Sequence, residues 1–274
     1  MNFERKIAKI ISNVSDAAPV VHHITNYVTV NDCANITLAI GASPIMADDL
    51  CEAAEITSLA QSLVINIGTL NRGTIESMLA AGKKANEIGV PVVLDPVGVG
   101  ASELRNKTVE KLLEEINFTI IRGNMSEIRY MAGSNANTKG VDASDSDIAS
   151  SAETGVELAG SLAQKYKCVV AITGATDIVS DSTHTVCIQN GNRMLRAVTG
   201  TGCMCTSLIG SFCSVEPDYL LATTAGILCM GIAGEIAFEK AGEKGTGSFR
   251  TAVIDEISRI DGESVIRRAK LYEA

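Results

Sequence analysis

Tryptophan is absent from this 274-residue chain, and aromatic residues make up only 4% of it. Hydrophobic residues still make up 46%, so the core must be built mainly from Ala, Val, Ile and Leu. Basic residues are also in the minority, with 23 Lys and Arg against 32 Asp and Glu and a formal net charge of −9. This balance argues against a nucleic-acid partner, because phosphate backbones are contacted chiefly by Lys and Arg.

Several patterns that would indicate other classes of protein are missing. The eight cysteines include no CxxC pair, which argues against a zinc site, and disulfide frameworks belong to shorter secreted chains. No GxxxxGK[ST] motif occurs, which excludes an ordinary P-loop. The N-terminal stretch lacks a signal-peptide run, and no segment reaches the roughly 18 uninterrupted apolar residues of a membrane span. We therefore expect a soluble cytoplasmic protein with no membrane partner.

Short, continuously apolar runs alternate with amphipathic helical patterns through the first two thirds of the chain. The clearest of these runs are Leu63–Ile67, Val90–Leu94, Thr119–Ile121 and Cys168–Ile172. Such runs are typical of strands covered on both faces, so we expect an α/β fold with a mostly parallel central sheet between helices. Beyond Thr201 the pattern is almost wholly helical. The polar stretch Gly133–Ser146 is expected to be an exposed loop inside one domain spanning residues 1–274.

The segment Val198–Ser207 (VTGTGCMCTS) joins a glycine turn to the start of a helix. Such a turn leaves backbone N–H groups unpaired at the positive end of the helix, which is a natural seat for phosphate. Cys203 lies where a thiol is most easily ionised, so it is a candidate activated side chain. A plain connecting turn with a buried, inert cysteine explains the segment equally well.

Polar side chains follow two of the predicted strands. Asp95 precedes a glycine turn, where its carboxylate could hold Mg²⁺ directly or through water, or could merely cap the turn. Arg122 could clamp a phosphate with its forked donors. Because ligands of open parallel sheets bind at the carboxyl ends of the strands, we expect these two side chains to border one site.

Other polar and sulfur-containing residues have a structural interpretation beside the functional one. Asn124 and Glu127 form a capping-box pattern, and Glu127 is otherwise a candidate to reach Mg²⁺ through water. Thr173 ends a strand and could meet a phosphate or simply face solvent. Asn26 is a typical turn or cap residue, and Met46 is by default a core residue.

Nine segments occur in a characteristic order between about residue 20 and residue 257. They are HHITNYVTVNDCAN, GASPIMADD, LVINIGTL, VPVVLDPVGVGAS, IIRGNMSEI, KGVD, VVAITGATDIV, VTGTGCMCTS and GTGSFRTAVID. Together they resemble the hydroxyethylthiazole kinase family of the ribokinase-like superfamily. HHITN, SPIMA and GTGC point to this family rather than to the superfamily at large.

The resemblance implies a ribokinase-like three-layer sandwich and an ATP-binding kinase, a transferase that needs Mg²⁺. Its substrate would be the primary alcohol of 4-methyl-5-(2-hydroxyethyl)thiazole, and its product the thiazole phosphate used in salvage for thiamine biosynthesis. The resemblance also implies a homotrimer in which the thiazole site lies between neighbouring subunits.

Roles for individual residues follow from the same resemblance. Arg122 and Thr173 match positions that bind ATP. Met46 and Gly200 match substrate-binding positions, and Asn26 lies in the matching HHITN motif.

The metal and the transferred phosphate have matching positions too. Asp95 and Glu127 match the acidic positions grouped around the metal, and Cys203 matches the catalytic-loop position. An anion hole, which we call the anion seat, would be formed by the backbone N–H groups of Gly200, Thr201, Gly202 and Cys203.

One residue departs from the wider superfamily, which usually has GAGD at this helix start with Asp as the proton acceptor. Cys203 stands there, as in the nearer family, and its thiolate could act as the base if the helix N-terminus lowers its pKa. Phosphoryl transfer depends mainly on positioning and charge stabilisation, so we expect the anion seat to matter more than the base.

Three alternatives share parts of this pattern. A kinase of hydroxymethylpyrimidine or of a sugar keeps the fold, but those relatives usually have GAGD. An ATP-dependent NAD(P)H-hydrate dehydratase would be a lyase on a related scaffold. A non-catalytic nucleotide-binding regulator is disfavoured by the intact phosphate and metal positions.

Overall fold

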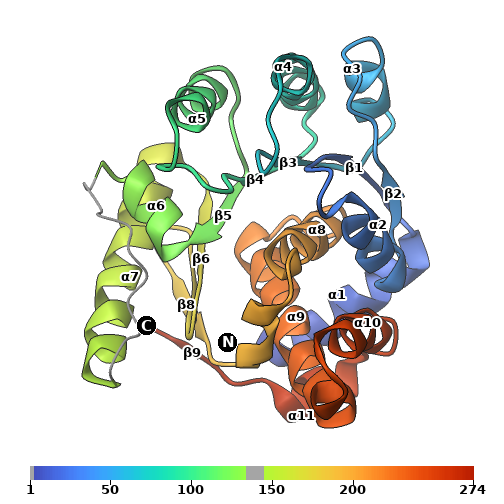
Figure 1. Cartoon of the computed structure of the whole chain (residues 1–274), viewed down its shortest axis with the longest axis vertical. Helices are drawn as coiled ribbons and strands as arrows, with labels where there is room; N and C mark the ends of the chain where they lie inside the picture. The colour runs from blue at the N-terminus through green and yellow to red at the C-terminus, as the bar shows by residue number, and fades with distance from the viewer. Residues whose placement is uncertain (1–2, 134–144) are drawn as a thin grey trace.

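A twisted nine-stranded sheet forms the centre of the protein, seen in a computed structural model that describes residues 3–133 and 145–274 (Figure 1). Across the sheet the strand order is β2-β1-β3-β4-β5-β6-β7-β8-β9. The first six of these neighbours run parallel: β2 (Ser43–Ile45), β1 (Val20–Ile24), β3 (Ser62–Asn66), β4 (Val92–Asp95), β5 (Ile120–Asn124) and β6 (Val169–Thr173). The remaining three add antiparallel: β7 (Asp177–Ser180), β8 (Thr185–Ile188) and β9 (Leu271–Glu273).

Helices cover both faces of this sheet, as Figure 1 shows. One face is covered by α3 (Ala53–Thr57), α4 (Arg72–Ile88), α5 (Glu103–Glu115), α6 (Met125–Met131) and α7 (Asp145–Tyr166). The other is covered by α1 (Phe3–Ala17), α2 (Val30–Ala39), α8 (Thr201–Cys213), α9 (Tyr219–Ala241), α10 (Thr246–Ile257) and α11 (Gly262–Arg268). Short 3₁₀ turns lie at Arg193–Ala197 and Gly242–Lys244. The predicted three-layer α/β sandwich is therefore confirmed.

Each central strand contributes to two cores at once. In β3, Leu63 and Ile65 pack into the core under α4 and α5, whereas Val64 packs into the core under α8. Successive side chains of a strand point to opposite faces, so a strand covered on both sides must be apolar throughout. This is why the sequence shows continuous apolar runs instead of alternation.

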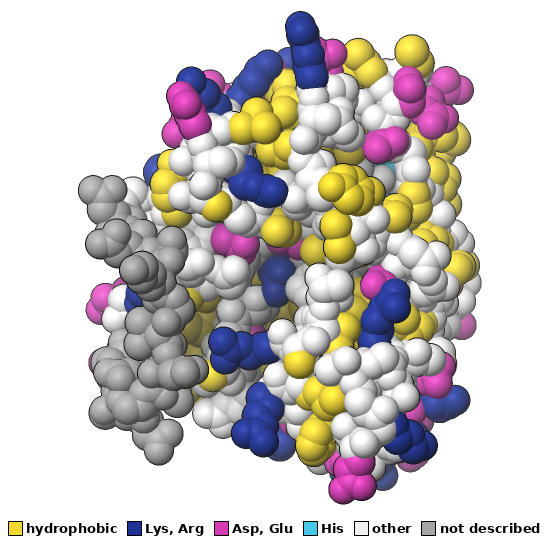
Figure 2. All heavy atoms as spheres, in the orientation of Figure 1, with side chains coloured by type: hydrophobic (Ala, Val, Ile, Leu, Met, Phe, Trp, Pro, Cys, Tyr) yellow, Lys and Arg dark blue, Asp and Glu magenta, His cyan; other side chains and the backbone are white. Residues whose placement is uncertain are grey.

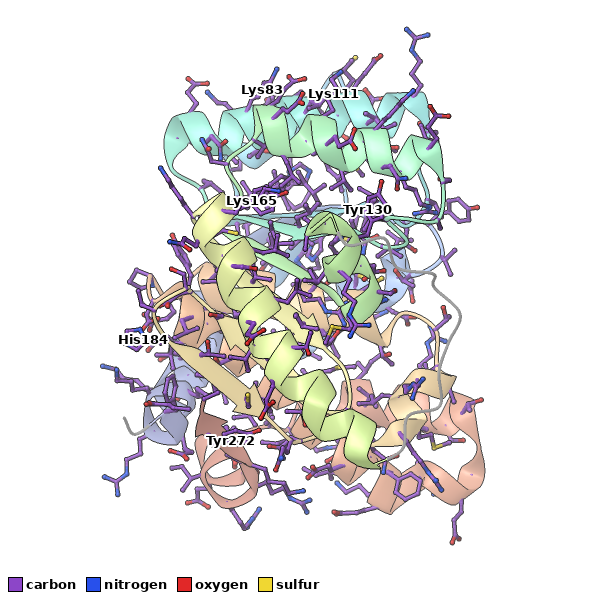
Figure 3. The ribbon with its side chains drawn as sticks, turned by 90° about the vertical axis from the view of Figure 1, so that its left-hand side faces the viewer. Lys83, Lys111, Tyr130, Lys165, His184 and Tyr272 are labelled. Carbon is purple, nitrogen blue, oxygen red and sulfur yellow. The ribbon has the colours of Figure 1, made fainter. Side chains whose placement is uncertain are left out.

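The helix boundaries follow local signals where these are strong. Asn71 accepts the Thr74 N–H, the Thr74 hydroxyl accepts the Asn71 N–H, and α4 ends at Gly89 with φ +75°. That positive φ favours glycine, which is why the helix ends there. Figure 3 shows His184 at the β7–β8 hairpin, on the opposite edge of the sheet from Tyr130.

Some expected elements differ from those observed. The strand expected over Thr119–Ile121 is β5, which covers Ile120–Asn124 and so continues beyond Ile121. The C-terminal strand β9 was not expected; its register is set by pairing with β8 instead of by an apolar pattern of its own. Of the expected loop at Gly133–Ser146, residues 134–144 lie outside the described residues.

One stretch within the described residues, Tyr219–Lys244, is long and apolar enough to cross a membrane. Its apolar window is 89% buried inside the molecule, where α9 packs between α8 and α10. It is a core helix of the sandwich.

Candidate active site

Five polar side chains come together where the parallel strands end. Asn26 follows β1, Asn66 ends β3, Asp95 ends β4, Arg122 lies in the middle of β5, and Thr173 ends β6. Asn66 and Asp95 are direct register partners across the ladder. Figure 2 looks onto this carboxyl edge and shows a hollow at its centre in which basic and acidic side chains lie together. The predicted gathering of Asp95 and Arg122 at this edge is confirmed.

The glycine turn before α8 opens into the same region. Gly200 has φ +86° and makes no side-chain cap, while the first intrahelical bond runs from Met204 N to the Gly200 carbonyl at 2.8 Å. The first N–H groups of α8 are thus left for a ligand, at the positive end of a 13-residue helix. A Cβ built on Gly202 would lie 2.7 Å from Arg122 Nη1, so the guanidinium rests against the turn. Gly200, Thr201 and Gly202 are only half-buried, so the turn is not sealed inside the molecule.

Cys203 begins the buried part of α8 and faces two amides. Its Sγ accepts N–H groups from Asn26 at 3.4 Å and from Asn66 at 3.3 Å. Burial raises the pKa of the Cys203 thiol, and the nearby Asp95 carboxylate raises it further, although the hydrogen bonds lower it. The ionised thiol expected at this helix start is therefore disfavoured, because desolvation outweighs the amide donors.

The strand-end side chains Asn26, Asn66, Asp95, Arg122 and Thr173 form a row along this edge, and the Asp95 carboxylate is fully buried near its centre. Its Oδ2 accepts Asn66 Nδ2 at 3.0 Å and the Thr206 hydroxyl at 2.8 Å, and Arg122 Nη1 lies 3.7 Å away. Its Oδ1 has no hydrogen-bond partner among the described residues. Burial raises the pKa of Asp95 to about 6, although the Arg122 charge acts in the opposite direction. A buried carboxylate oxygen without a donor is suited to a cation or to an ordered water.

Arg122 connects this carboxylate to the next strand. Its Nη2 donates to the Thr173 hydroxyl, which also lies 3.4 Å from the Gly123 carbonyl. The side chain is only 11% exposed, and its Nε has no partner among the residues described. A buried guanidinium with a spare donor beside an uncapped helix start is an arrangement that can bind phosphate.

Glu127 has the capping geometry that the sequence allowed. Its Oε2 accepts the Asn124 N–H at 2.8 Å, and Asn124 Oδ1 accepts the Glu127 N–H at 3.0 Å. Its Oε1 accepts the Gly98 N–H at 2.8 Å, which ties the loop after β4 to the start of α6. Within the described ranges, no group of three His, Cys, Asp or Glu side chains is placed to hold a metal by itself.

Met46 lies at the far end of the row. It follows β2, an edge strand of the sheet, and is half-buried. With strands about 4.8 Å apart, three strand spacings separate the ends of β2 and β4, or roughly 14 Å. The order across the edge therefore separates Met46 and Asn26 from Arg122 and Thr173, with Asp95 between them.

Sequence reasoning missed three residues of this region. Asn66 ends an apolar run in the same way as Asp95, so the strand-end rule could have found it. Thr206 lies one turn into α8, and no local signal marks its contact with Asp95. Asp177 accepts the Gly174 N–H at 2.8 Å, and burial raises its pKa to about 7 beside Arg122.

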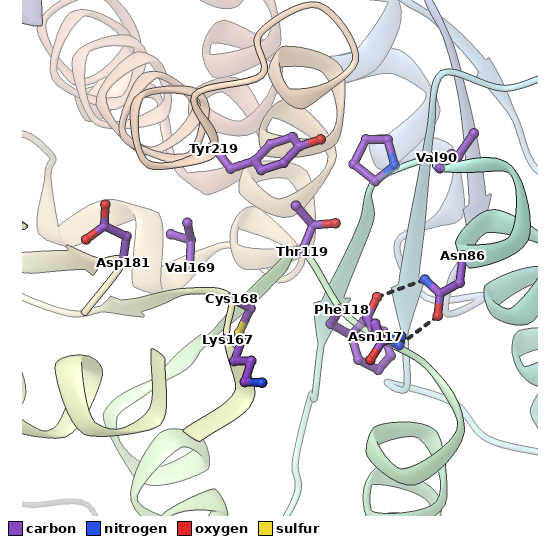
Figure 4. A pocket seen from close by; sticks show the side chains of 12 residues that line it. Asn86, Val90, Asn117, Phe118, Thr119, Lys167, Cys168, Val169, Asp181 and Tyr219 are labelled. Atoms are coloured by element: carbon purple, nitrogen blue, oxygen red, sulfur yellow. Dashed lines mark hydrogen bonds between the residues drawn. The ribbon is translucent and has the colours of Figure 1, made fainter. Parts of the chain in front are cut away.

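The opposite, amino edge of the sheet has a hollow of its own, of about 460 Å³ (Figure 4). It lies beneath the starts of β4, β5 and β6, and its lining includes Thr119, Lys167 and Tyr219. There the Asn86 side chain donates to the Asn117 carbonyl at 2.9 Å and accepts the Asn117 N–H at 2.7 Å. It includes none of the residues predicted for the site.

Comparisons with known proteins agree with this geometry. The family model described as the hydroxyethylthiazole kinase family matches residues 11–263. The hydroxyethylthiazole kinase of Clostridium beijerinckii is 57% identical over 268 residues, covering 98% of this chain and 97% of that protein. That of Ruminiclostridium cellulolyticum is 57% identical over 271 residues, covering 99% and 98%.

Solved structures give the same picture. The hydroxyethylthiazole kinase protein of Pyrococcus horikoshii superposes with a TM-score of 0.89 at 38% identity, over 98% of this chain and 99% of that one. A ribokinase-like superfamily protein of Enterococcus faecalis reaches 0.62 at 9% identity, over 93% and 95%, which shows the shared fold alone. Because the family model covers residues 11–263 and relatives 57% identical cover nearly the whole chain, the chain belongs to the hydroxyethylthiazole kinase family.

Proposed function

We propose that this protein transfers the γ-phosphate of ATP to the hydroxyl of 4-methyl-5-(2-hydroxyethyl)thiazole, giving the thiazole phosphate used for thiamine diphosphate. The observation that carries the proposal is the uncapped start of α8 with the buried Arg122 guanidinium against it. Such a seat is complementary to a transferring phosphoryl group, whose negative charge is spread over its outer oxygens. Residues 1–274 act in this proposal as one cytoplasmic kinase domain.

The nucleotide phosphates lie on the β5 and β6 side of the row in this proposal. Arg122 and Thr173 bind them, since the guanidinium and the hydroxyl already face each other there. The backbone N–H groups of Thr201, Gly202 and Cys203 receive the charge on the transferring oxygens. No proton needs to leave Cys203 for this stabilisation to act.

The thiazole lies on the β1 and β2 side, bounded by Asn26, Met46 and Gly200. Asn26 is held by Thr29, whose N–H and hydroxyl both donate to its Oδ1 at 3.1 and 3.0 Å. Its amide is therefore fixed before substrate arrives, which lowers the entropy cost of orienting the alcohol. Whether Cys203 accepts the alcohol proton or only shapes the seat is decided by the Cys203→Ala experiment below.

Mg²⁺ is part of the proposal because ATP carries several negative charges. The unpartnered Oδ1 of Asp95 gives the buried acceptor that a hydrated cation needs, and Glu127 lies in the first turn of α6, directly after β5. Asp95 and Glu127 would hold the ion through water. When bound, the ion would neutralise phosphate charge during transfer.

A homotrimer with the thiazole site between subunits also belongs to the proposal. Tyr27 and Val28 follow Asn26 directly and are 79% and 56% exposed. Apolar side chains left in solvent beside a substrate site are suited to be covered by a second copy of the chain.

The proposal is tested by measuring ADP release and product mass with the thiazole alcohol, with hydroxymethylpyrimidine and with neither, each with and without Mg²⁺. We expect Mg²⁺-dependent phosphorylation that is at least about tenfold more efficient with the thiazole alcohol, since pocket contacts of one or two groups give that much discrimination. Preferred phosphorylation of the pyrimidine alcohol, or no ADP release with either alcohol, would contradict it.

A further inference from the structure

A buried carboxylate lies beside the glycine turn and is paired with a residue far away in the sequence. Asp32 is in the first turn of α2, and its side chain is only 5% exposed. Arg250, on α10, donates from Nε to both carboxylate oxygens at 3.0 and 3.1 Å, and from Nη2 to Oδ1. This pair connects α2 to the GTGSFR segment, which the proposed catalytic groups leave without a role.

The pair lies against the first residue of the anion seat. A Cβ built on Gly200 would lie 2.6 Å from Thr29 Cγ2 and 3.8 Å from Asp32 Oδ2. At the other end of the turn, the Arg122 guanidinium lies against Gly202. The seat is therefore placed between a cation on one side and a carboxylate on the other.

This placement has an electrostatic consequence for a bound phosphoryl group. A carboxylate a few ångströms behind Gly200 is poorly screened by water, because it is buried, and it opposes the attraction that Arg122 and the helix start exert. Pairing with Arg250 cancels that charge, while Asp32 still interacts favourably with the positive end of α2.

We propose that Arg250 is a positioning residue of the anion seat: by pairing with Asp32 it neutralises the carboxylate next to Gly200, so that the seat accepts phosphate. The inference rests on the proposed function only in taking the α8 turn as the seat of the ATP phosphates. It does not depend on which alcohol is phosphorylated.

The test compares Arg250→Ala, Asp32→Asn and the double variant with the unchanged protein. Mg²⁺·ATP binding is measured by calorimetry in low and high salt, and KM for the neutral thiazole alcohol is measured at saturating ATP. Arg268→Ala is a matched control, because Arg268 forms a two-pronged pair with Glu239 between α11 and α9, at 2.8 and 3.0 Å. Melting temperatures are measured for all variants.

We expect Arg250→Ala to weaken ATP binding about tenfold in low salt, because it leaves the Asp32 charge uncancelled. Asp32→Asn should bind ATP as tightly as the unchanged protein or more tightly, and the double variant should return to within about threefold of it. The Arg250→Ala effect should shrink in about 0.5 M salt, and the KM for the alcohol should not change. Arg268→Ala should change neither quantity.

The inference is overturned if Asp32→Asn does not reverse the Arg250→Ala loss, or if ATP and alcohol binding weaken together, since both results mark a merely structural pair. If Arg250→Ala does not fold, Arg250→Lys and Arg250→Gln replace it. The lysine variant should then bind ATP close to normally and the glutamine variant should not, and equal binding by the two overturns the inference. Because ATP binding is read directly, a failure to phosphorylate the thiazole would count against the proposed function alone.

Discussion

The two edges of the same sheet differ in how their polar groups are satisfied. At the carboxyl edge, side chains join neighbouring strand ends: Asn66 to Asp95, Arg122 to Thr173, and Glu127 to Gly98. At the amino edge there is a hollow of about 460 Å³, where the Asn86 side chain already has both its donor and its acceptor paired with the Asn117 backbone. The polar groups that link neighbouring strand ends therefore lie at the carboxyl edge, whereas the hollow of about 460 Å³ lies at the amino edge.

Unsatisfied groups mark the carboxyl edge as the functional one. Four buried side-chain atoms lack a partner among the described residues, and two of them are Asp95 Oδ1 and Arg122 Nε. Leaving such groups unpaired costs free energy, so they persist where a ligand completes them. The uncapped α8 start adds backbone donors to the same place. In this molecule, buried donors and acceptors without a partner mark the candidate site more clearly than cavity volume does.

The largest effect that would sharpen this comparison is expected at Arg122. Arg122→Ala should lower kcat/KM for ATP about 1,000-fold, because it removes the forked donor that receives phosphate charge. KM for the thiazole alcohol should change much less. Lys167→Ala, at the amino edge, is the matched control and should change kcat/KM less than about twofold. Comparable losses from both variants, or equal losses for ATP and the alcohol, would break the contrast between the edges.

An effect of intermediate size is expected at Asp95. Asp95→Asn should lower kcat/KM about 100-fold, because it removes a charge at the centre of the row. In the unchanged protein, kcat/KM should fall as the pH drops below about 6, where Asp95 becomes protonated.

The contribution of Asp95 to stability should depend on pH in the opposite sense to its contribution to activity. The folded-state pKa of Asp95, about 6, is above its ordinary value of 3.8, so its contribution to stability is fully present below pH 3.8 and is lost as the pH rises through 6. Measured without Mg²⁺, the unfolding free energy of the unchanged protein minus that of Asp95→Asn should therefore fall by about 2–3 kcal/mol between pH 4 and pH 7. A difference that does not vary with pH would show that folding does not raise the pKa of Asp95.

Much of this edge could be predicted from the sequence, because a strand-end residue is recognised from the apolar run directly before it. Asp95 and Arg122 each follow an apolar run, and parallel strands bring such ends to one edge whatever the detailed register. The glycine turn before α8 could also be predicted from the sequence, since Gly200 has the positive φ that only glycine adopts easily.

The pairings across the chain could not be predicted in this way. Thr206 meets Asp95 across 111 residues, and Arg250 meets Asp32 across 218, with no periodicity to signal either contact. The burial of each side chain could not be predicted from the sequence either. A helix start alone favours a thiolate at Cys203, but desolvation in the packed fold raises the pKa of this thiol.

The smallest effect, and the one that decides how the seat works, is expected at Cys203. Cys203→Ala should retain measurable activity, with kcat about tenfold lower or less, because the backbone N–H groups that stabilise the moving phosphoryl remain in place. Cys203→Asp should raise kcat, because a carboxylate is a stronger acceptor for the alcohol proton at neutral pH than a buried thiol. Cys213→Ala, at the buried far end of the same helix, controls for lost packing and should leave kcat unchanged. Complete loss of activity in Cys203→Ala with ATP binding intact would mean that the sulfur itself takes the proton, and that the anion seat is not sufficient.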